Sequence, residues 1–378
     1  MLALCPTRLL TPAGFETGRC VMIEDGHIIG TPQLSDCAGS VSLEHLDGDL
    51  VPGFIDLQVN GGGGILFNEE PTVEGIAAIG RAHRRFGTTG FLPTVISDDL
   101  DVVDRAMRAV ESAIARRVPG VLGIHVEGPF SNTAKRDIHD AGKTRQIDGS
   151  AVELLTSLDR GITLVTLAPE LAPPGTIETL VQAGVVVSAG HSAASYEEVC
   201  RALDEGLTGF THLFNGMTQL HSRAPGVVGA ALDSEDSWCG IILDGFHVHP
   251  ASLRIALAAK GPERLVLVTD AMPTVGSERK IFMLGDRHIC ESQGWCTAED
   301  GTLAGSALDM ASAVRNAIDT LAVELGAALK MASRNPARAV ALEDVTGAIR
   351  PGLRADLVLL DPDVHVLRSW IYGECESA

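Results

Sequence analysis

The sequence is poor in positive charge and in aromatic residues. Lys and Arg number 29 against 49 Asp and Glu, which gives a formal net charge of −20, and Phe, Trp and Tyr make up 4% of the 378 residues. Nucleic-acid backbones are bound through dense Lys and Arg, and single-stranded bases stack on aromatic side chains. The composition therefore argues against a nucleic-acid partner and against binding to an anionic membrane.

Paired cysteines and long apolar runs are also missing. The eight cysteines are spread along the chain without a Cys-x-x-Cys pair, which argues against a disulfide framework or a structural zinc knuckle. No apolar run reaches about 18 residues and no basic, then apolar leader opens the chain. We therefore expect a cytoplasmic protein with no membrane partner. The 45% hydrophobic and 21% charged residues are typical of a globular fold.

From residue 51 onward, short apolar runs alternate with longer amphipathic stretches, a pattern typical of repeated βα units. Helices are expected between the runs, at 73–86, 99–117, 195–205 and 250–260, and after the last run at 307–333. An α/β fold of the (β/α)8 TIM-like barrel type, about 250 residues long, fits this count best, and an open doubly wound sheet is the alternative. The eight strand-like runs are 51–59, 89–95, 121–126, 162–167, 185–189, 209–214, 239–243 and 265–269.

The two ends of the chain are different in character from the middle. Short β-like pieces flank an Asp25-Gly26 turn, which is a strong hairpin signal, and similar pieces occur at 357–360 and 365–367. We predict that residues 1–50 and 345–378 form a small β-sandwich domain and that 51–344 form the barrel. Residues 277–302 are expected to make a hairpin-rich excursion.

Four ionisable residues each end or directly follow a strand-like run: Glu127, His191, His212 and Asp270. In a barrel, the ends of the strands form the catalytic rim. One Glu oxygen and two neutral His nitrogens leave an open position on an ion, as in catalytic zinc sites. The pattern predicts a metal held by Glu127, His191 and His212, with Asp270 as the general base beside it. Each residue taken alone is more often a hydrogen-bonded structural group.

Two further residues follow later strand-like runs. Arg223 lies in the loop 216–226, and the planar donors of Arg suit a phosphate, although a solvated loop charge is an equal alternative. His247 can donate a hydrogen bond to a developing oxyanion or simply bond within its loop. The glycine run 61–64 lacks the Gly-Lys-Ser or Gly-Lys-Thr of a phosphate-binding loop, so it indicates a turn.

These motifs together resemble the N-acetylglucosamine-6-phosphate deacetylase family of the metal-dependent amidohydrolase superfamily. The most specific matches are HVEGPF at 125–130 and THLFNGM at 211–217. The other matching stretches are PGFIDLQVNG at 52–61, SAGHS at 188–192, DGFHV at 244–248, LVTDA at 267–271 and GTLAGS at 301–306. In order and spacing they cover nearly the whole chain.

The resemblance implies hydrolysis of the acetamide of N-acetylglucosamine 6-phosphate to glucosamine 6-phosphate and acetate, in amino-sugar metabolism. It gives Glu127, His191 and His212 as ligands of one divalent metal ion, Asp270 as acid and base, and His247 as the group that polarises the acetyl carbonyl. It also implies a homodimer in which Arg223 reaches the phosphate in the neighbouring subunit. The positions implied for contact with the phosphorylated sugar are Ile138, His139, Asn215, Gly216, Arg223, His247, Leu303, Ala304 and Gly305.

The first strand of this chain departs from the wider superfamily, in which it usually ends His-x-His and helps to hold a second metal. Here it ends Gln58-x-Asn60. Gln and Asn are weak ligands for zinc or iron, so we expect one tightly held ion, zinc or else iron or another divalent metal, and at most a weak second site at Gln58 and Asn60.

The match also departs at Gly216, where Ala is common, and at Pro273-Thr274; neither change is expected to disturb the chemistry. Three alternatives remain open: a different N-acetylhexosamine phosphate as substrate, a different N-acyl compound, or a barrel that has lost catalysis and acts as a scaffold.

Overall fold

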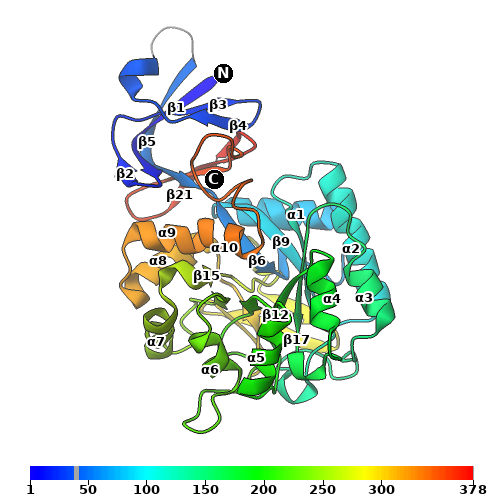
Figure 1. Cartoon of the computed structure of the whole chain (residues 1–378). Helices are drawn as coiled ribbons and strands as arrows, with labels where there is room; N and C mark the ends of the chain where they lie inside the picture. Colours follow the sequence, from blue (N-terminus) through cyan, green and yellow to red (C-terminus); the bar gives the residue numbers. More distant parts are fainter. Residues whose placement is uncertain (38–41, 378) are drawn as a thin grey trace.

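The computed structural model describes residues 1–37 and 42–377, which form a barrel with a small β domain at one end (Figure 1). Within these residues, no helix is both long and apolar enough to cross a membrane. The eight barrel strands are parallel and pair in the order of the chain. They are β6 (Phe54–Val59), β9 (Thr88–Ile96), β10 (Gly123–Glu127), β11 (Ile162–Leu167), β12 (Val186–Ala189), β13 (Gly209–Phe210), β14 (Trp238–Ile241) and β15 (Leu265–Leu267).

The two outermost barrel strands meet just beyond their ends. Val59 and Ala271 form a parallel bridge, and the Asn60 amide donates a hydrogen bond of 2.9 Å to the Ala271 carbonyl. The predicted (β/α)8 barrel is therefore confirmed, and the open sheet is not observed.

Helices cover the outside of the barrel, and the four long ones predicted from periodicity are present. The expected helix 307–333 is instead two helices, because Ala322 adopts a left-handed φ of 54° where the first one ends. The prediction missed several helices of six to eight residues, which are too short to show a helical period. The helices are α1 (Val73–Arg84), α2 (Leu100–Ala115), α3 (Gly149–Leu155), α4 (Thr176–Gln182), α5 (Tyr196–Asp204), α6 (Gly226–Asp233), α7 (Pro250–Lys260), α8 (Met310–Leu321), α9 (Leu325–Ala332) and α10 (Arg334–Ala339).

Both ends of the chain form a small β domain, as predicted, and Figure 1 shows their blue and red ribbons side by side. Their strands belong to one sheet. The central strand β5 runs parallel to β1 and antiparallel to β20. The hairpin at Asp25-Gly26 is confirmed, with both residues at positive φ. The strands are β1 (Leu2–Thr11), β2 (Gly14–Glu16), β3 (Val21–Glu24), β4 (His27–Gly30), β5 (Ser42–Pro52), β20 (Leu357–Leu360), β21 (Val366–Ile371) and β22 (Glu374–Ser377).

The excursion after the last barrel strand is a four-stranded antiparallel sheet that extends slightly further than predicted. It consists of β16 (Ile281–Leu284), β17 (Arg287–Ser292), β18 (Trp295–Ala298) and β19 (Leu303–Ser306). The glycine run forms a small hairpin of β7 (Gly61–Gly62) and β8 (Ile65–Leu66), which agrees with the predicted turn. Both lie beyond the carboxyl ends of barrel strands, so they can wall the space above the rim.

Candidate active site

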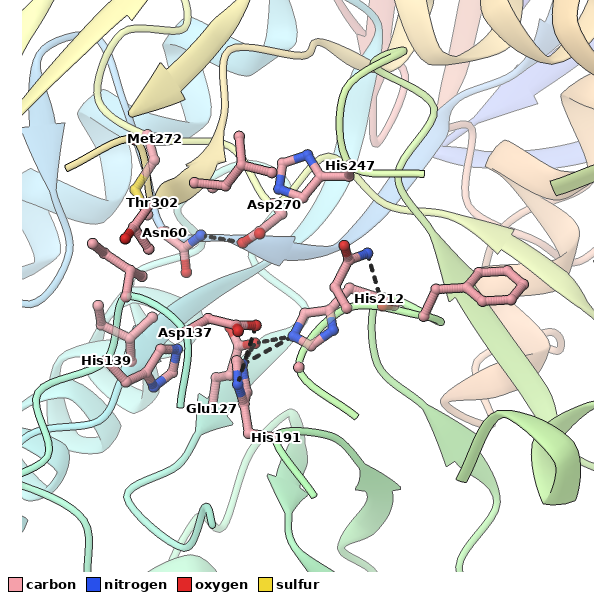
Figure 2. Close-up of a pocket in the computed structure, with 18 residues that line it drawn as sticks. Asn60, Glu127, Asp137, His139, His191, His212, His247, Asp270, Met272 and Thr302 are labelled. Carbon is pink, nitrogen blue, oxygen red and sulfur yellow. Dashed lines mark hydrogen bonds and ion pairs between the residues drawn. The ribbon is translucent and has the colours of Figure 1, made fainter. Parts of the chain in front are cut away.

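A cavity of about 430 Å³ opens at the carboxyl ends of the barrel strands, and Figure 2 shows the side chains that point into it. Its wall combines barrel rim residues with residues of the β16–β19 excursion. The lining residues are Asn60, Ile96, Glu127, Asp137, Ile138, His139, His191, His212, Phe214, Asn215, Gly216, His247, Asp270, Met272, Gly301, Thr302, Leu303 and Gly305.

Glu127, His191 and His212 converge at the floor of this cavity. Glu127 ends β10, and the two histidines follow the ends of β12 and β13. Glu127 Oε1 lies 2.9 Å from His212 Nε2 and 3.3 Å from His191 Nε2, and the two nitrogens are 3.0 Å apart. An ion bonded at about 2.0–2.2 Å to three such atoms holds them roughly this far from one another. The three side chains therefore fit a divalent metal.

The surroundings prepare these groups for binding an ion. His191 Nδ1 donates a hydrogen bond of 2.9 Å to the Lys135 carbonyl, which leaves the Nε2 lone pair facing the cavity. Burial opposes the charge on Glu127, but hydrogen bonds with His191 and His212 hold the pKa of this carboxyl well below its usual range. The site therefore presents one anionic oxygen and imidazole nitrogens, a donor set that zinc and iron accept.

His139 lies beside this cluster. Together with Glu127 and His191 it forms a group whose ligand atoms all lie within 4.8 Å of one another. Its Nδ1 is 2.8 Å from the Ser97 hydroxyl, and burial lowers the pKa of His139 to about 3. His139 is therefore a neutral imidazole at the cavity wall, where the sequence predicted a sugar contact.

Asp270 faces the cluster across the cavity (Figure 2). Its Oδ1 accepts hydrogen bonds of 2.6 Å from Asn60 Nδ2 and 3.1 Å from Gln58 Nε2, and Gln58 Nε2 also lies 3.0–3.1 Å from both Glu127 oxygens. Burial, with the nearby charge of Glu127, raises the pKa of Asp270 to about 6. Gln58 Nε2 thus lies between the two carboxylates and donates to both, while Asn60 Nδ2 donates to Asp270 alone.

His247 lies on the same side of the cavity as Asp270. Its Nδ1 is 2.6 Å from Asp244 Oδ2, and Asp244 Oδ1 accepts hydrogen bonds from the backbone amides of Phe246 and His247. Burial opposes the imidazolium, but the bond to Asp244 raises the pKa of His247 above its ordinary value of 6.5. The ring is thereby fixed in orientation, with an N–H available to a ligand.

The residues predicted to contact a sugar are mostly found at the cavity. Ile138, His139, Asn215, Gly216, His247, Leu303 and Gly305 line it. Ala304 does not, because it is fully buried in the apolar cluster of the excursion. Arg223 lies in an exposed loop before α6 and does not line the cavity of its own chain.

Several lining residues were not predicted, among them Asp137, Phe214, Met272 and Thr302. Phe214 and Thr302 stand inside matched motifs, so the motifs themselves were the available signal. Asp137 directly precedes Ile138 and Met272 lies two residues after Asp270, but nothing in their chemistry distinguishes them.

Three of the four residues predicted for the metal site adopt the left-handed backbone conformation, as do Asp137 and Phe214 of the cavity wall. The φ angle is 49° for His191, 35° for His212 and 53° for Asp270. Such conformations cost a non-glycine residue roughly 1–3 kcal/mol and persist only where the surroundings impose them. This backbone conformation turns each side chain from the strand end toward the cavity. The sequence gives no sign of it.

Comparison with known proteins agrees with this geometry. The amidohydrolase family model matches residues 50–376, and the chain belongs to this family of metal-dependent hydrolases. The N-acetylgalactosamine-6-phosphate deacetylase of Shewanella sp. (strain ANA-3) is 45% identical over 99% of this chain and 95% of its own.

Two solved structures are similar over the whole fold. The crystal structure of N-acetylglucosamine-6-phosphate deacetylase from Pasteurella multocida has a TM-score of 0.95 and 31% identity and covers 100% of both chains. That of a Mycobacterium smegmatis deacetylase mutant in complex with N-acetyl-D-glucosamine-6-phosphate has a TM-score of 0.89 and 30% identity over 99% of this chain and 98% of its own. Within the family, the protein is therefore a deacetylase.

Proposed function

We propose that this enzyme hydrolyses the acetamide of N-acetylglucosamine 6-phosphate to glucosamine 6-phosphate and acetate. The observation that carries the proposal is the buried cluster of Glu127, His191 and His212 facing Asp270 across one cavity. Likeness to the Pasteurella and Mycobacterium deacetylases supports this substrate.

We assign one divalent ion, zinc or alternatively iron, to Glu127 Oε1, His191 Nε2 and His212 Nε2. A bound ion supplies Lewis acidity at the amide carbonyl and lowers the pKa of a water toward about 7. Gln58 and Asn60 donate hydrogen bonds to Glu127 and Asp270, and their amide groups are weak metal ligands, which supports a single tight site.

Asp270 acts as base and then as acid. It takes a proton from the attacking water as the water oxygen adds to the carbonyl carbon, and it gives this proton to the amide nitrogen as the C–N bond breaks. The amine then leaves neutral rather than as a strongly basic anion. Gln58 and Asn60 keep the Asp270 carboxylate pointed at the reacting atoms.

His247 stabilises the oxyanion that forms when water adds. Asp244 accepts a hydrogen bond from Nδ1 and favours the protonated ring, so Nε2 also carries a proton that it can donate into the cavity. Such a preorganised donor is most effective where negative charge develops in the transition state.

We place the sugar against Ile138, His139, Asn215, Gly216, Leu303 and Gly305. The exposed Arg223 supports a homodimer in which this residue binds the phosphate in the partner's site, because it does not reach its own. We place the protein in the cytoplasm, where sugar phosphates are metabolised.

A second candidate substrate is N-acetylgalactosamine 6-phosphate, which the name of the Shewanella relative favours. An acetate-release assay on the 6-phosphates of N-acetylglucosamine, N-acetylgalactosamine and N-acetylmannosamine, and on the plain sugars, separates these options. We expect the highest kcat/KM for N-acetylglucosamine 6-phosphate. A higher value for the galacto compound would establish the second candidate, and no acetate release from any sugar by metal-loaded protein would refute both.

A further inference from the structure

The backbone at Asp270 is held by a set of hydrogen bonds outside the cavity. The carbonyl of Asp270 accepts a hydrogen bond of 2.9 Å from the Ser306 amide, and the carbonyl of Thr269 accepts one of 2.6 Å from the Ser306 hydroxyl. These bonds fix the peptides on both sides of the strained Asp270, whose φ is 53°. A left-handed aspartate needs such restraint, because relaxation would turn its carboxylate away.

A second carboxylate completes this restraint. Asp56 lies on β6, is fully buried and does not line the cavity. Its Oδ2 accepts a hydrogen bond of 2.5 Å from the Thr269 hydroxyl, and its Oδ1 accepts hydrogen bonds of 3.2 Å from the backbone amides of Thr269 and Gln58. All three partners donate to the carboxyl oxygens of Asp56. The side chain is therefore engaged with the backbone and with Thr269, away from the substrate cavity.

The chemistry of Asp56 is not that of a space-filling residue. Burying a carboxylate is costly, and an apolar residue would fill the same volume at lower cost. These hydrogen bonds offset part of that cost, and they hold Thr269, the residue that directly precedes Asp270.

We propose that Asp56, Thr269 and Ser306 are positioning residues that hold Asp270 in its catalytic orientation. Strand β6 and the residue after it thereby support Asp270 twice, through Asp56 behind the backbone and through Gln58 and Asn60 at the carboxylate. The proposal rests on the proposed function of Asp270 as acid and base.

The test is a set of threonine variants measured as metal-loaded full-length enzyme. Thr269→Val removes the hydroxyl that reaches Asp56, and Thr269→Ser keeps it. We expect Thr269→Val to lower kcat by about 10- to 100-fold, the scale of a misplaced catalytic group, with KM within about threefold and metal content unchanged. Thr269→Ser should return kcat to within about threefold of wild type.

Thr88→Val is the matched control. Thr88 is also buried in a barrel strand, but its hydroxyl has no hydrogen-bond partner among the residues that the structure describes. The same loss of a hydroxyl there should leave kcat unchanged. Asp56→Asn is the second variant, should Thr269→Val fail to fold, and the same selective loss of kcat is expected.

A Thr269→Val enzyme with kcat within twofold of wild type would overturn the proposal, as would a Thr269→Ser enzyme as slow as Thr269→Val. If wild-type enzyme releases no acetate from any sugar, the proposed function fails, and crystal structures decide the positioning role separately. In Thr269→Val the Asp270 carboxylate should then have left Asn60, whereas an unmoved carboxylate refutes the role.

Discussion

His191 Nε2 and His212 Nε2 lie 3.0 Å apart, and both side chains are buried. Two neutral imidazoles that present lone pairs to each other at this distance repel, and burial removes the water that would screen them. The pair is stable only around a shared cation or proton, with Glu127 Oε1 as the anionic third partner. This contact makes metal loading the first property to measure.

Removal of one histidine should abolish stable metal loading. We expect His212→Ala to lower the bound metal at least tenfold, because two remaining ligands hold a divalent ion weakly. Elemental analysis after dialysis measures this directly. The control is His249→Ala, since the His249 side chain accepts a hydrogen bond from the Ala251 amide at the start of α7 and is not among the residues that line the cavity. Full metal occupancy in His212→Ala would show that the ion binds elsewhere.

Replacement of Asp270 by Asn should separate catalysis from metal binding. The amide cannot take a proton from water, so kcat should fall by about 10²–10⁴, the usual scale for positioned acid–base catalysis. Metal content should stay at the wild-type level, because the three proposed ligands are intact. Steady-state kinetics with elemental analysis of the same preparation checks both. Near-normal turnover would remove Asp270 from the mechanism.

Gly216→Ala should weaken metal binding in this chain. An added Cβ would lie 2.8 Å from His191 Nδ1 and 2.7 Å from Asp137 Oδ2, at a φ of 56° that strains any residue with a side chain. The Asp137 side chain is exposed and can move, but His191 is buried and fixed. Metal titration should show a raised Kd in the variant. An unchanged Kd would mean that the loop shifts at no cost.

Loss of the Asp244 carboxylate should move the alkaline limb of the pH profile. The hydrogen bond to Asp244 raises the pKa of His247 above 6.5, so the pair stabilises the fold fully below about pH 6.5, and this stability is lost as pH rises through the raised pKa. In Asp244→Asn the pKa of His247 should fall, so the alkaline limb of kcat/KM should shift to lower pH. Histidine NMR titration measures the pKa itself. An unmoved His247 resonance would contradict the assignment.

Arg223→Ala should chiefly weaken recognition of the phosphate. We expect the preference in kcat/KM for the phosphorylated over the plain sugar to shrink by about 10-fold or more, because a charge-assisted contact is worth roughly 1.5–3 kcal/mol. The exposed Arg108 on α2 supplies the control variant Arg108→Ala. An unchanged preference would place the phosphate away from Arg223, and a monomer in sedimentation would remove its proposed route to the site.

The sequence predicted the rim of the site well because parallel strands end at one edge. Glu127, His191, His212 and Asp270 share no local motif, but each stands at a strand end, and closure of the barrel brings those ends together. Periodicity and turn chemistry are local signals, so the long helices and the Asp25-Gly26 hairpin could also be predicted from the sequence.

What the sequence did not reveal depends on contacts between distant segments. Ala304 belongs to a matched motif but turns into an apolar cluster, and only the packing of the excursion decides its direction. The positive φ of Asp270 depends on Ser306 and Asp56, and no propensity encodes it. The short helices α3 and α10 likewise depend on tertiary packing.

The small domain has a consequence for synthesis of the chain. Strand β5, which ends at Pro52, pairs with β20, which begins at Leu357, so 305 residues must follow before this edge gains its neighbour. At roughly 5–20 residues per second, the edge waits about 15–60 s on the ribosome. Throughout that interval a row of backbone donors and acceptors is open to other nascent chains. The barrel can therefore fold before the small domain is complete, and the edge of β5 is protected from aggregation only once β20 has been synthesised and has paired with it.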